Sequence, residues 1–140
     1  MDEIGAEATL AAESGGLLKI GCVSALEAQS ARATVSVRSD WYSAEVPFET
    51  SIDRVRDFLE SLRSVLATGI GACGFINDDG NFDLRVEMSR NGHVSVSGVL
   101  SKNMFDDLQL KFGLRTDRYS LEVFERALRK ITGDALAIGS

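Results

Sequence analysis

Four carboxylates, those of Asp78, Asp79, Asp83 and Glu87, lie within one short segment of this 140-residue chain. Carboxylates bind cations, transfer protons or attract basic partners, depending on their surroundings. An EF-hand calcium loop needs oxygen ligands two residues apart, Gly at position six and Glu at position twelve, and no register of this segment has that pattern. The Asp79-Gly80 dipeptide instead predicts a polar β-hairpin turn.

The other reactive residues do not form a recognisable catalytic set. Residues 69–74 read GxGxxG, but they follow a predicted helix and precede a predicted strand, the reverse of a dinucleotide-binding loop. His93 is the only histidine, and no motif supplies it with a nucleophile or an orienting carboxylate. Cys22 and Cys73 lack metal-ligand spacing and are expected to be reduced and largely buried. We therefore expect no catalytic residue, no cofactor and no metal, and a protein that is not an enzyme.

Composition indicates one globular domain over residues 1–140. Apolar residues make up 44% and charged residues 26%, and no apolar run is long enough to span a membrane. The N-terminal segment begins with acidic residues rather than the basic start of a secretory signal, so a cytoplasmic protein is expected. The net charge of -6 disfavours nucleic acid as a partner. It either attracts a basic protein or serves solubility alone.

Alternating apolar residues predict a series of antiparallel strands. The C-terminal meander is expected at 72–77, 82–88, 93–100 and 108–114. Its hairpins carry the dipeptides Asp79-Gly80 and Asn91-Gly92, which are typical of type I′ turns. Three earlier strands are expected near 18–22, 33–37 and 42–48. Residues 1–15 are expected either to fray or to form a weak extra strand.

Two amphipathic helices are predicted between and after these strands. Their apolar stripes are Ile52, Val55, Phe58, Leu59, Leu62 and Leu66, then Leu121, Phe124, Leu128 and Ile131. Thr50 with Asp53 resembles a capping pair at the start of the first helix, and Gly69 can end it. Ser120 or Asp117 caps the second helix, and Gly133 stops it. The charged faces opposite the stripes are expected to be solvated, including Arg54, Arg56, Asp57, Glu60, Arg63, Glu122, Glu125, Arg126 and Arg129.

The economical arrangement of these elements is an α+β fold. A single twisted antiparallel β-sheet of about six to seven strands, ending in the C-terminal meander, would carry both amphipathic helices on one face. The apolar stripes of the helices would then bury the apolar face of the sheet. The opposite face of the sheet would point towards water, with Asp83, Arg85, Glu87, Ser95, Ser97, Gln109 and Lys111.

Parts of this pattern resemble a known protein family. The segments are Val46–Glu49, Phe58–Leu62, Gly71-Ala72, Leu84–Met88, Asn91–Gly98, Leu108–Phe112 and Thr116–Leu121. Over residues 40–132 the sequence is similar to the WapI-type immunity proteins of bacterial polymorphic toxin systems. The Gly-His-Val strand from Gly92 and the Asp-x-x-x-Leu helix start at Asp117 are the most characteristic parts. The resemblance implies a protein that binds and neutralises a cognate toxin, often a nuclease-like domain.

Such a protein would act by steric occlusion, without catalysis. An acidic surface would steer a basic toxin towards it, and we expect the hairpin residues Asp78, Asp79, Asp83 and Glu87 to contribute to the contact. The main alternative is a type III secretion-type chaperone, which is also small, acidic and α+β and would hold an extended effector segment. A third alternative is a small enzyme that uses His93 beside a carboxylate. The oligomeric state is left open.

Overall fold

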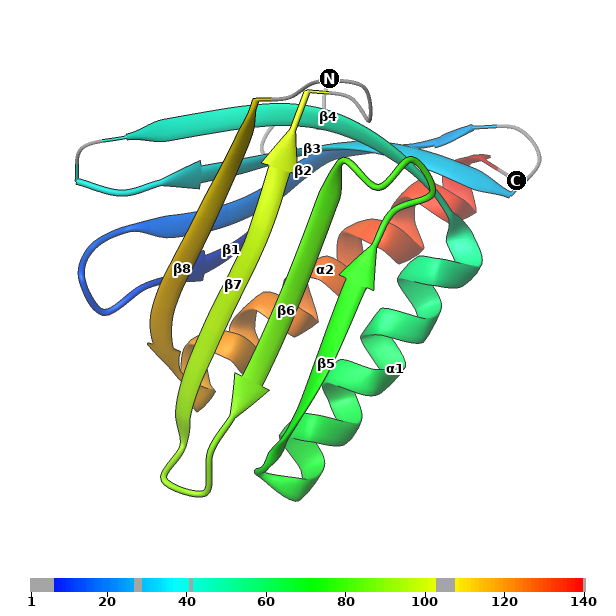
Figure 1. The fold of residues 1–140 in the computed structure, drawn as a ribbon. Coiled ribbons are helices and arrows are strands. Elements are labelled where there is room, and N and C mark those ends of the chain that lie inside the picture. The colour runs from blue at the N-terminus through cyan, green and yellow to red at the C-terminus, as the bar shows by residue number, and fades with distance from the viewer. Residues whose placement is uncertain (1–6, 27–28, 41, 103–107, 140) are drawn as a thin grey trace.

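The computed structural model describes residues 7–26, 29–40, 42–102 and 108–139, with the side chains of the last helix described as far as Gly133. Eight strands and two helices occur in these residues (Figure 1). Their bounds are β1 Glu7–Ala11, β2 Leu17–Leu26, β3 Ser30–Arg38, β4 Ser43–Ser51, α1 Ile52–Thr68, β5 Gly71–Ile76, β6 Phe82–Met88, β7 His93–Ser101, β8 Gln109–Asp117 and α2 Arg118–Gly139. The order of four strands followed by a helix therefore occurs twice.

The strands form two separate four-stranded antiparallel sheets. The first has the order β1-β2-β3-β4 and the second has the order β5-β6-β7-β8. Figure 1 shows the strands of the second sheet running across those of the first, with α2 passing behind the second sheet. α1 lies alongside β5, whereas α2 packs against β1 and β2 and also contacts α1. The core lies between the two sheets and is closed by the helices.

The α+β class and the antiparallel pairing are confirmed, but the prediction of one sheet with both helices on one face is wrong. β4 ends at Ser51 and α1 begins at Ile52, so the chain leaves the first sheet before β5 starts the second. Alternation shows that each strand has one buried face, but it does not say which strands share a ladder. Two sheets that bury their apolar faces against each other satisfy the same pattern.

The N-terminal segment forms a strand rather than fraying. In β1, Ala8 lies opposite Ile20 and Leu10 lies opposite Leu18, and both β1 side chains are fully buried. The extra strand is therefore confirmed for residues 7–11. Residues 1–6 lie outside the described part of the chain.

The C-terminal meander is confirmed, although its last strand runs from Gln109 to Asp117 rather than over 108–114. Its turns differ from the predicted type I′ turns. Gly80 and Gly92 have φ angles of 74° and 81°, whereas the residue before each glycine has a negative φ. Each glycine N–H donates to the carbonyl three residues earlier at 3.0 Å. Both connections are type I turns closed by a glycine in the left-handed conformation.

The two helices begin and end partly as predicted. Gly69 ends α1 with a φ of 77°, and Asp117 caps α2 by accepting the Ser120 N–H at 2.8 Å. The predicted cap at Thr50 is wrong, because the N-cap residue of α1 is Ser51. The Ser51 side chain makes no capping hydrogen bond to the helix. α2 also continues through Gly133, since a glycine inside a helix costs only about 1 kcal/mol.

Candidate partner-binding surfaces

Two buried asparagines anchor the predicted acidic hairpin to the rest of the molecule. Asn77 and Asn81 are 1% and 5% exposed, and Asn77 Nδ2 donates to Asn81 Oδ1 at 2.7 Å. Asn77 Nδ2 also donates to the Glu49 carbonyl at 3.0 Å, and Asn81 Nδ2 donates to the Pro47 carbonyl at 3.1 Å. Both carbonyls belong to β4, an edge strand of the first sheet. The β5–β6 turn therefore fastens the second sheet to the first.

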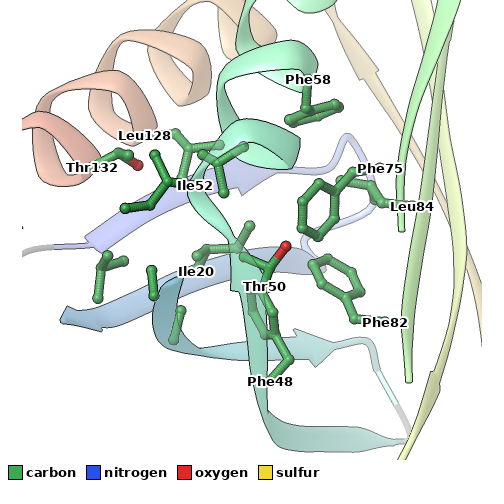
Figure 2. Close-up of a pocket in the computed structure, with 14 residues that line it drawn as sticks. Ile20, Phe48, Thr50, Ile52, Phe58, Phe75, Phe82, Leu84, Leu128 and Thr132 are labelled. Carbon is green, nitrogen blue, oxygen red and sulfur yellow. The ribbon is translucent and has the colours of Figure 1, made fainter. Parts of the chain in front are cut away.

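Phenylalanine rings from both sheets meet in the core (Figure 2). The ring centroid of Phe48, on the first sheet, lies 5.0 Å from that of Phe82 and 6.0 Å from that of Phe75, on the second. These rings line an apolar cavity of about 40 Å³ that extends towards Leu128 and Thr132 of α2. Ligand pockets are usually several-fold larger, at roughly 300 Å³ or more. We interpret this cavity as imperfect core packing.

Asp78 is tied to the start of α1. Its Oδ1 accepts the backbone N–H of Ser51 at 3.3 Å and lies 2.8 Å from Arg54 Nε. Ser51 is the N-cap residue, so the carboxylate sits at the positive end of the helix dipole. Asp78 therefore holds the hairpin against α1.

The three other predicted acidic residues are not in equivalent surroundings. Glu87 Oε2 lies 3.1 Å from Arg85 Nη2, which offsets its charge. Among the described residues, the carboxylates of Asp79 and Asp83 have no ion-pair partner. Asp83 and Glu87 share the outward face of β6, with Arg85 between them. The structure thus places all four acidic residues on one hairpin, but it does not join them into a continuous acidic patch.

The outward face of the second sheet is polar, as predicted. Asp83 on this face is half-buried, and the remaining predicted side chains are exposed: Arg85, Glu87, Ser95, Ser97, Gln109 and Lys111. Lys111 and Asp83 lie on either side of Val99 in the same cross-strand row. The face therefore mixes both signs of charge.

Little of the net negative charge lies on the described residues. Five of the 21 acidic residues and none of the 15 basic residues fall in segments 1–6, 27–28 and 103–107, outside the described part of the chain. Asp134 also lies beyond the described side chains, which leaves 15 acidic and 15 basic residues whose side chains are described. The low isoelectric point consequently does not identify a binding face. The charges of neighbouring side chains on each surface determine which partner that surface could attract.

Charged side chains build part of the contact between α1 and α2. Glu125 is only 6% exposed and pairs with Arg129, which also donates to the Leu59 carbonyl of α1 at 3.4 Å. Arg118 Nη2 donates to the Leu66 carbonyl at 2.6 Å, in the last turn of α1. Helix-terminal carbonyls lack partners within their own helix, so a guanidinium there is stabilising. The prediction that the charged face of α2 is solvated is therefore wrong for Glu125, which is buried, whereas Arg126 is exposed as predicted.

His93, the histidine of the enzyme alternative, lies at the exposed start of β7. It lines a shallow, open depression together with Glu87, and its ladder partner is Asp117. The carboxylate of Asp117 accepts the backbone N–H of Ser120, which holds the pKa of Asp117 below its usual value. Asp117 is therefore engaged as a helix cap.

The two cysteines differ, although both were expected to be buried. Cys73 is buried, and this burial raises the pKa of its thiol to about 11. Cys22 is exposed. It has a φ of 55° at an irregularity in the pairing of β2 between Gly21 and Ser24. Such a bulge interrupts the alternation that placed Cys22 on the inner face.

The described residues contain no group of three or more His, Cys, Asp or Glu side chains arranged to hold a metal ion. Neither α1 nor the described length of α2 is apolar enough, over a sufficient span, to cross a membrane.

Solved structures with a similar fold come from proteins of very different sequence. One is "Crystal structures of trypanosoma bruciei MRP1/MRP2", with a TM-score of 0.53, 8% identity, and coverage of 96% of this chain and 86% of that chain. Another is the plant transcriptional regulator PBF-2, with a TM-score of 0.52, 12% identity, and coverage of 99% of this chain and 86% of that chain. At such identities the likeness defines the fold class alone.

The sequence comparison is more specific. The family model of the immunity protein WapI-like family matches residues 27–134, which run from the β2–β3 connection into α2. The chain therefore belongs to the WapI-like immunity protein family, and the resemblance seen over residues 40–132 is confirmed. None of the curated proteins compared with this sequence matches it.

Proposed function

We propose that this protein neutralises a cognate toxin domain by binding to it directly and covering its active site. The observation that supports this function is the family match over residues 27–134. Occlusion requires shape and charge complementarity but no catalytic residue in the immunity protein. We place this binding in the bacterial cytoplasm, and we propose a toxin with a basic active-site surface, as a nuclease that holds phosphate would have.

The acidic hairpin is one contact that we propose. Asp79 and Asp83 are the two hairpin carboxylates without an ion-pair partner among the described residues, so their charge is available to a basic toxin. Glu87 faces the same way but is offset by Arg85. Asp78 contributes mainly by holding the turn against α1.

Growth rescue and co-purification test the function. The toxin candidate is the C-terminal domain encoded by the neighbouring open reading frame, induced with and without this protein. We expect rescue of growth and a one-to-one complex on a sizing column, weaker at high salt. Continued killing with no complex at either salt concentration would contradict the pairing. Capture of an extended segment rather than a folded toxin domain would favour the chaperone alternative.

Charge reversal tests the hairpin contact. Asp79→Lys combined with Asp83→Lys should slow association and weaken protection, because rim charges act mainly on the association rate. The matched control is Asp40→Lys with Asp57→Lys, which changes the net charge equally at two exposed positions outside the hairpin. Unchanged affinity of the hairpin variant at low salt would remove this surface from the proposal.

A further inference from the structure

A second surface lies on the opposite side of α1 from the hairpin. Arg54, which contacts Asp78, and Arg63 are nine residues apart, so they project from opposite sides of the helix. Beyond Arg63, α1 and α2 enclose an open groove of about 380 Å³. It is lined by Arg63, Leu66, Ala67, Arg118, Glu122, Glu125 and Arg126.

The groove contains two guanidinium groups whose charge is not offset. Two ion pairs account for its other charges, Arg118 with Glu122 at 3.3 Å and Glu125 with Arg129. Arg63 and Arg126 are exposed, and among the described residues neither side chain has an ion-pair or hydrogen-bond partner. The local charge of the groove is therefore positive, although the whole chain is acidic.

Exposed apolar side chains continue this surface along α2. Tyr119 is 70% exposed and Val123 is 39% exposed. Their spacing of four residues, and the three further residues to Arg126, place all three on one face of the helix. Tyrosine and arginine are enriched at the energetic centres of protein interfaces, where an apolar body is buried and a polar end finds a partner.

We propose that Arg63, Arg126, Tyr119 and Val123 form a contact surface for the toxin, the α1–α2 surface, and that it receives a carboxylate-bearing segment of a folded toxin domain. This inference rests on the proposed function. The planar guanidinium groups suit bidentate pairing with carboxylates, while the tyrosine and valine bury apolar area beside them. Because Arg118 and Arg129 are paired with Glu122 and Glu125, only the two guanidinium groups of Arg63 and Arg126 are available, too few to hold a chain of closely spaced phosphates, so a protein segment fits better than nucleic acid.

Binding of purified variants to the toxin domain from the neighbouring reading frame tests this surface. Arg63→Glu with Arg126→Glu should raise the Kd about tenfold or more at low salt, because like charges would then face each other. The control is Arg38→Glu with Arg90→Glu, two exposed arginines outside the groove, and it should change the Kd by less than about threefold. Tyr119→Ala should also weaken binding, but with little dependence on salt.

The outcomes separate this inference from the proposed function. If the wild-type protein neither binds nor protects, the function fails and the α1–α2 surface fails with it. If the wild type binds and protects but the Arg63/Arg126 variant matches its control, only the α1–α2 surface is overturned. A single-stranded oligonucleotide that binds the wild type but not this variant, with toxin binding unchanged, would overturn the choice of a carboxylate partner. Circular dichroism melting checks folding, and Arg63→Gln with Arg126→Gln replaces any variant that unfolds.

Discussion

Asn77 Nδ2 donates a 2.7 Å hydrogen bond to Asn81 Oδ1, and this buried pair joins the two sheets. Asn77 Oδ1 accepts the Phe82 N–H at 3.0 Å, and Asn81 Nδ2 also donates to the Ser101 carbonyl at 3.2 Å. Together with the hydrogen bonds to the β4 carbonyls, the pair connects strands from both sheets. Each side-chain amide nitrogen and oxygen of the two asparagines has a hydrogen-bond partner. A buried polar network of this kind stabilises only while every member keeps its partners.

Replacing Asn77 with alanine should therefore destabilise the fold. The change leaves the Glu49 carbonyl and the Asn81 side chain short of partners in a buried site, at an expected cost of about 2–3 kcal/mol. Urea denaturation measures this free energy of unfolding. Gln109→Ala, at an exposed position of β8, is the control and should stay within about 0.5 kcal/mol of wild type. Equal effects of the two variants would contradict the role of the asparagine pair.

Two glycines of the second sheet should respond differently to alanine. A Cβ at Gly98 would lie 2.3 Å from the Asp83 carbonyl oxygen and 2.6 Å from the Phe112 ring, whereas a Cβ at Gly113 meets nothing within 4 Å. Gly98→Ala should cost about 2 kcal/mol or more, because a backbone carbonyl has little room to move. Gly113→Ala should be neutral or stabilising by up to about 1 kcal/mol. A small loss for Gly98→Ala in thermal or urea unfolding would show that β6 and β7 can separate locally.

Asp117 should contribute to stability in a pH-dependent way. The backbone N–H of Ser120 lowers the pKa of Asp117 from its usual 3.8. A lowered pKa in the folded state stabilises above the unfolded value, and this contribution is lost as the pH falls through the folded pKa. The difference in free energy of unfolding between wild type and Asp117→Asn should therefore be constant near neutrality. It should become smaller as the pH falls below 3.8, because the stabilising contribution of the ionised carboxylate is lost. Urea titrations from neutral to acidic pH measure it, and a difference that stays constant down to strong acid would argue against the cap.

The two thiols should differ in reactivity. Cys22 is exposed, whereas Cys73 is buried with its pKa raised to about 11. Because the thiolate is the reacting species, a disulfide reagent at mildly alkaline pH should label one thiol in the folded protein and two in denaturant. Cys22→Ser should abolish labelling of the folded protein. Labelling of the folded Cys22→Ser variant at a rate similar to wild type would show that β5 opens readily.

The helices, strands and hairpin turns could be predicted from the sequence, because each depends on residues that lie within a few positions of one another. The spacing from Phe58 to Leu66 predicts the buried stripe of α1, and the alternation in β6 predicts which side chains face outwards. Gly80 and Gly92 marked both hairpins, although the turn type depended on the residue before each glycine. The family resemblance rested on these same turn and core residues.

The partners of individual polar side chains did not follow from the sequence. The segment around Asp79 showed a polar turn, but nothing local indicated that Asn77 and Asn81 would reach carbonyls of β4 about thirty residues away. Two asparagines flanking a turn beside buried strands were the available signal. The contact of Arg129 with α1 could not be predicted for the same reason. A charged residue on the polar face of a helix is predicted to be solvated unless the position of the neighbouring helix is known.

The α+β class, the antiparallel meander, the two amphipathic helices and the family could all be predicted from the sequence. These depend on periodicity and turn residues, which act over a few positions. The division of the strands into two sheets could not be predicted, because hydrophobic alternation is the same in either arrangement. The charges that are available to a partner also depend on the tertiary structure. Arg54 forms an ion pair with Asp78, and Arg85 forms one with Glu87. Four other charged residues have no ion-pair partner among the described residues: Asp79, Asp83, Arg63 and Arg126. A charge acts on a partner only to the extent that its own neighbours leave it uncompensated, and those neighbours come from distant parts of the chain.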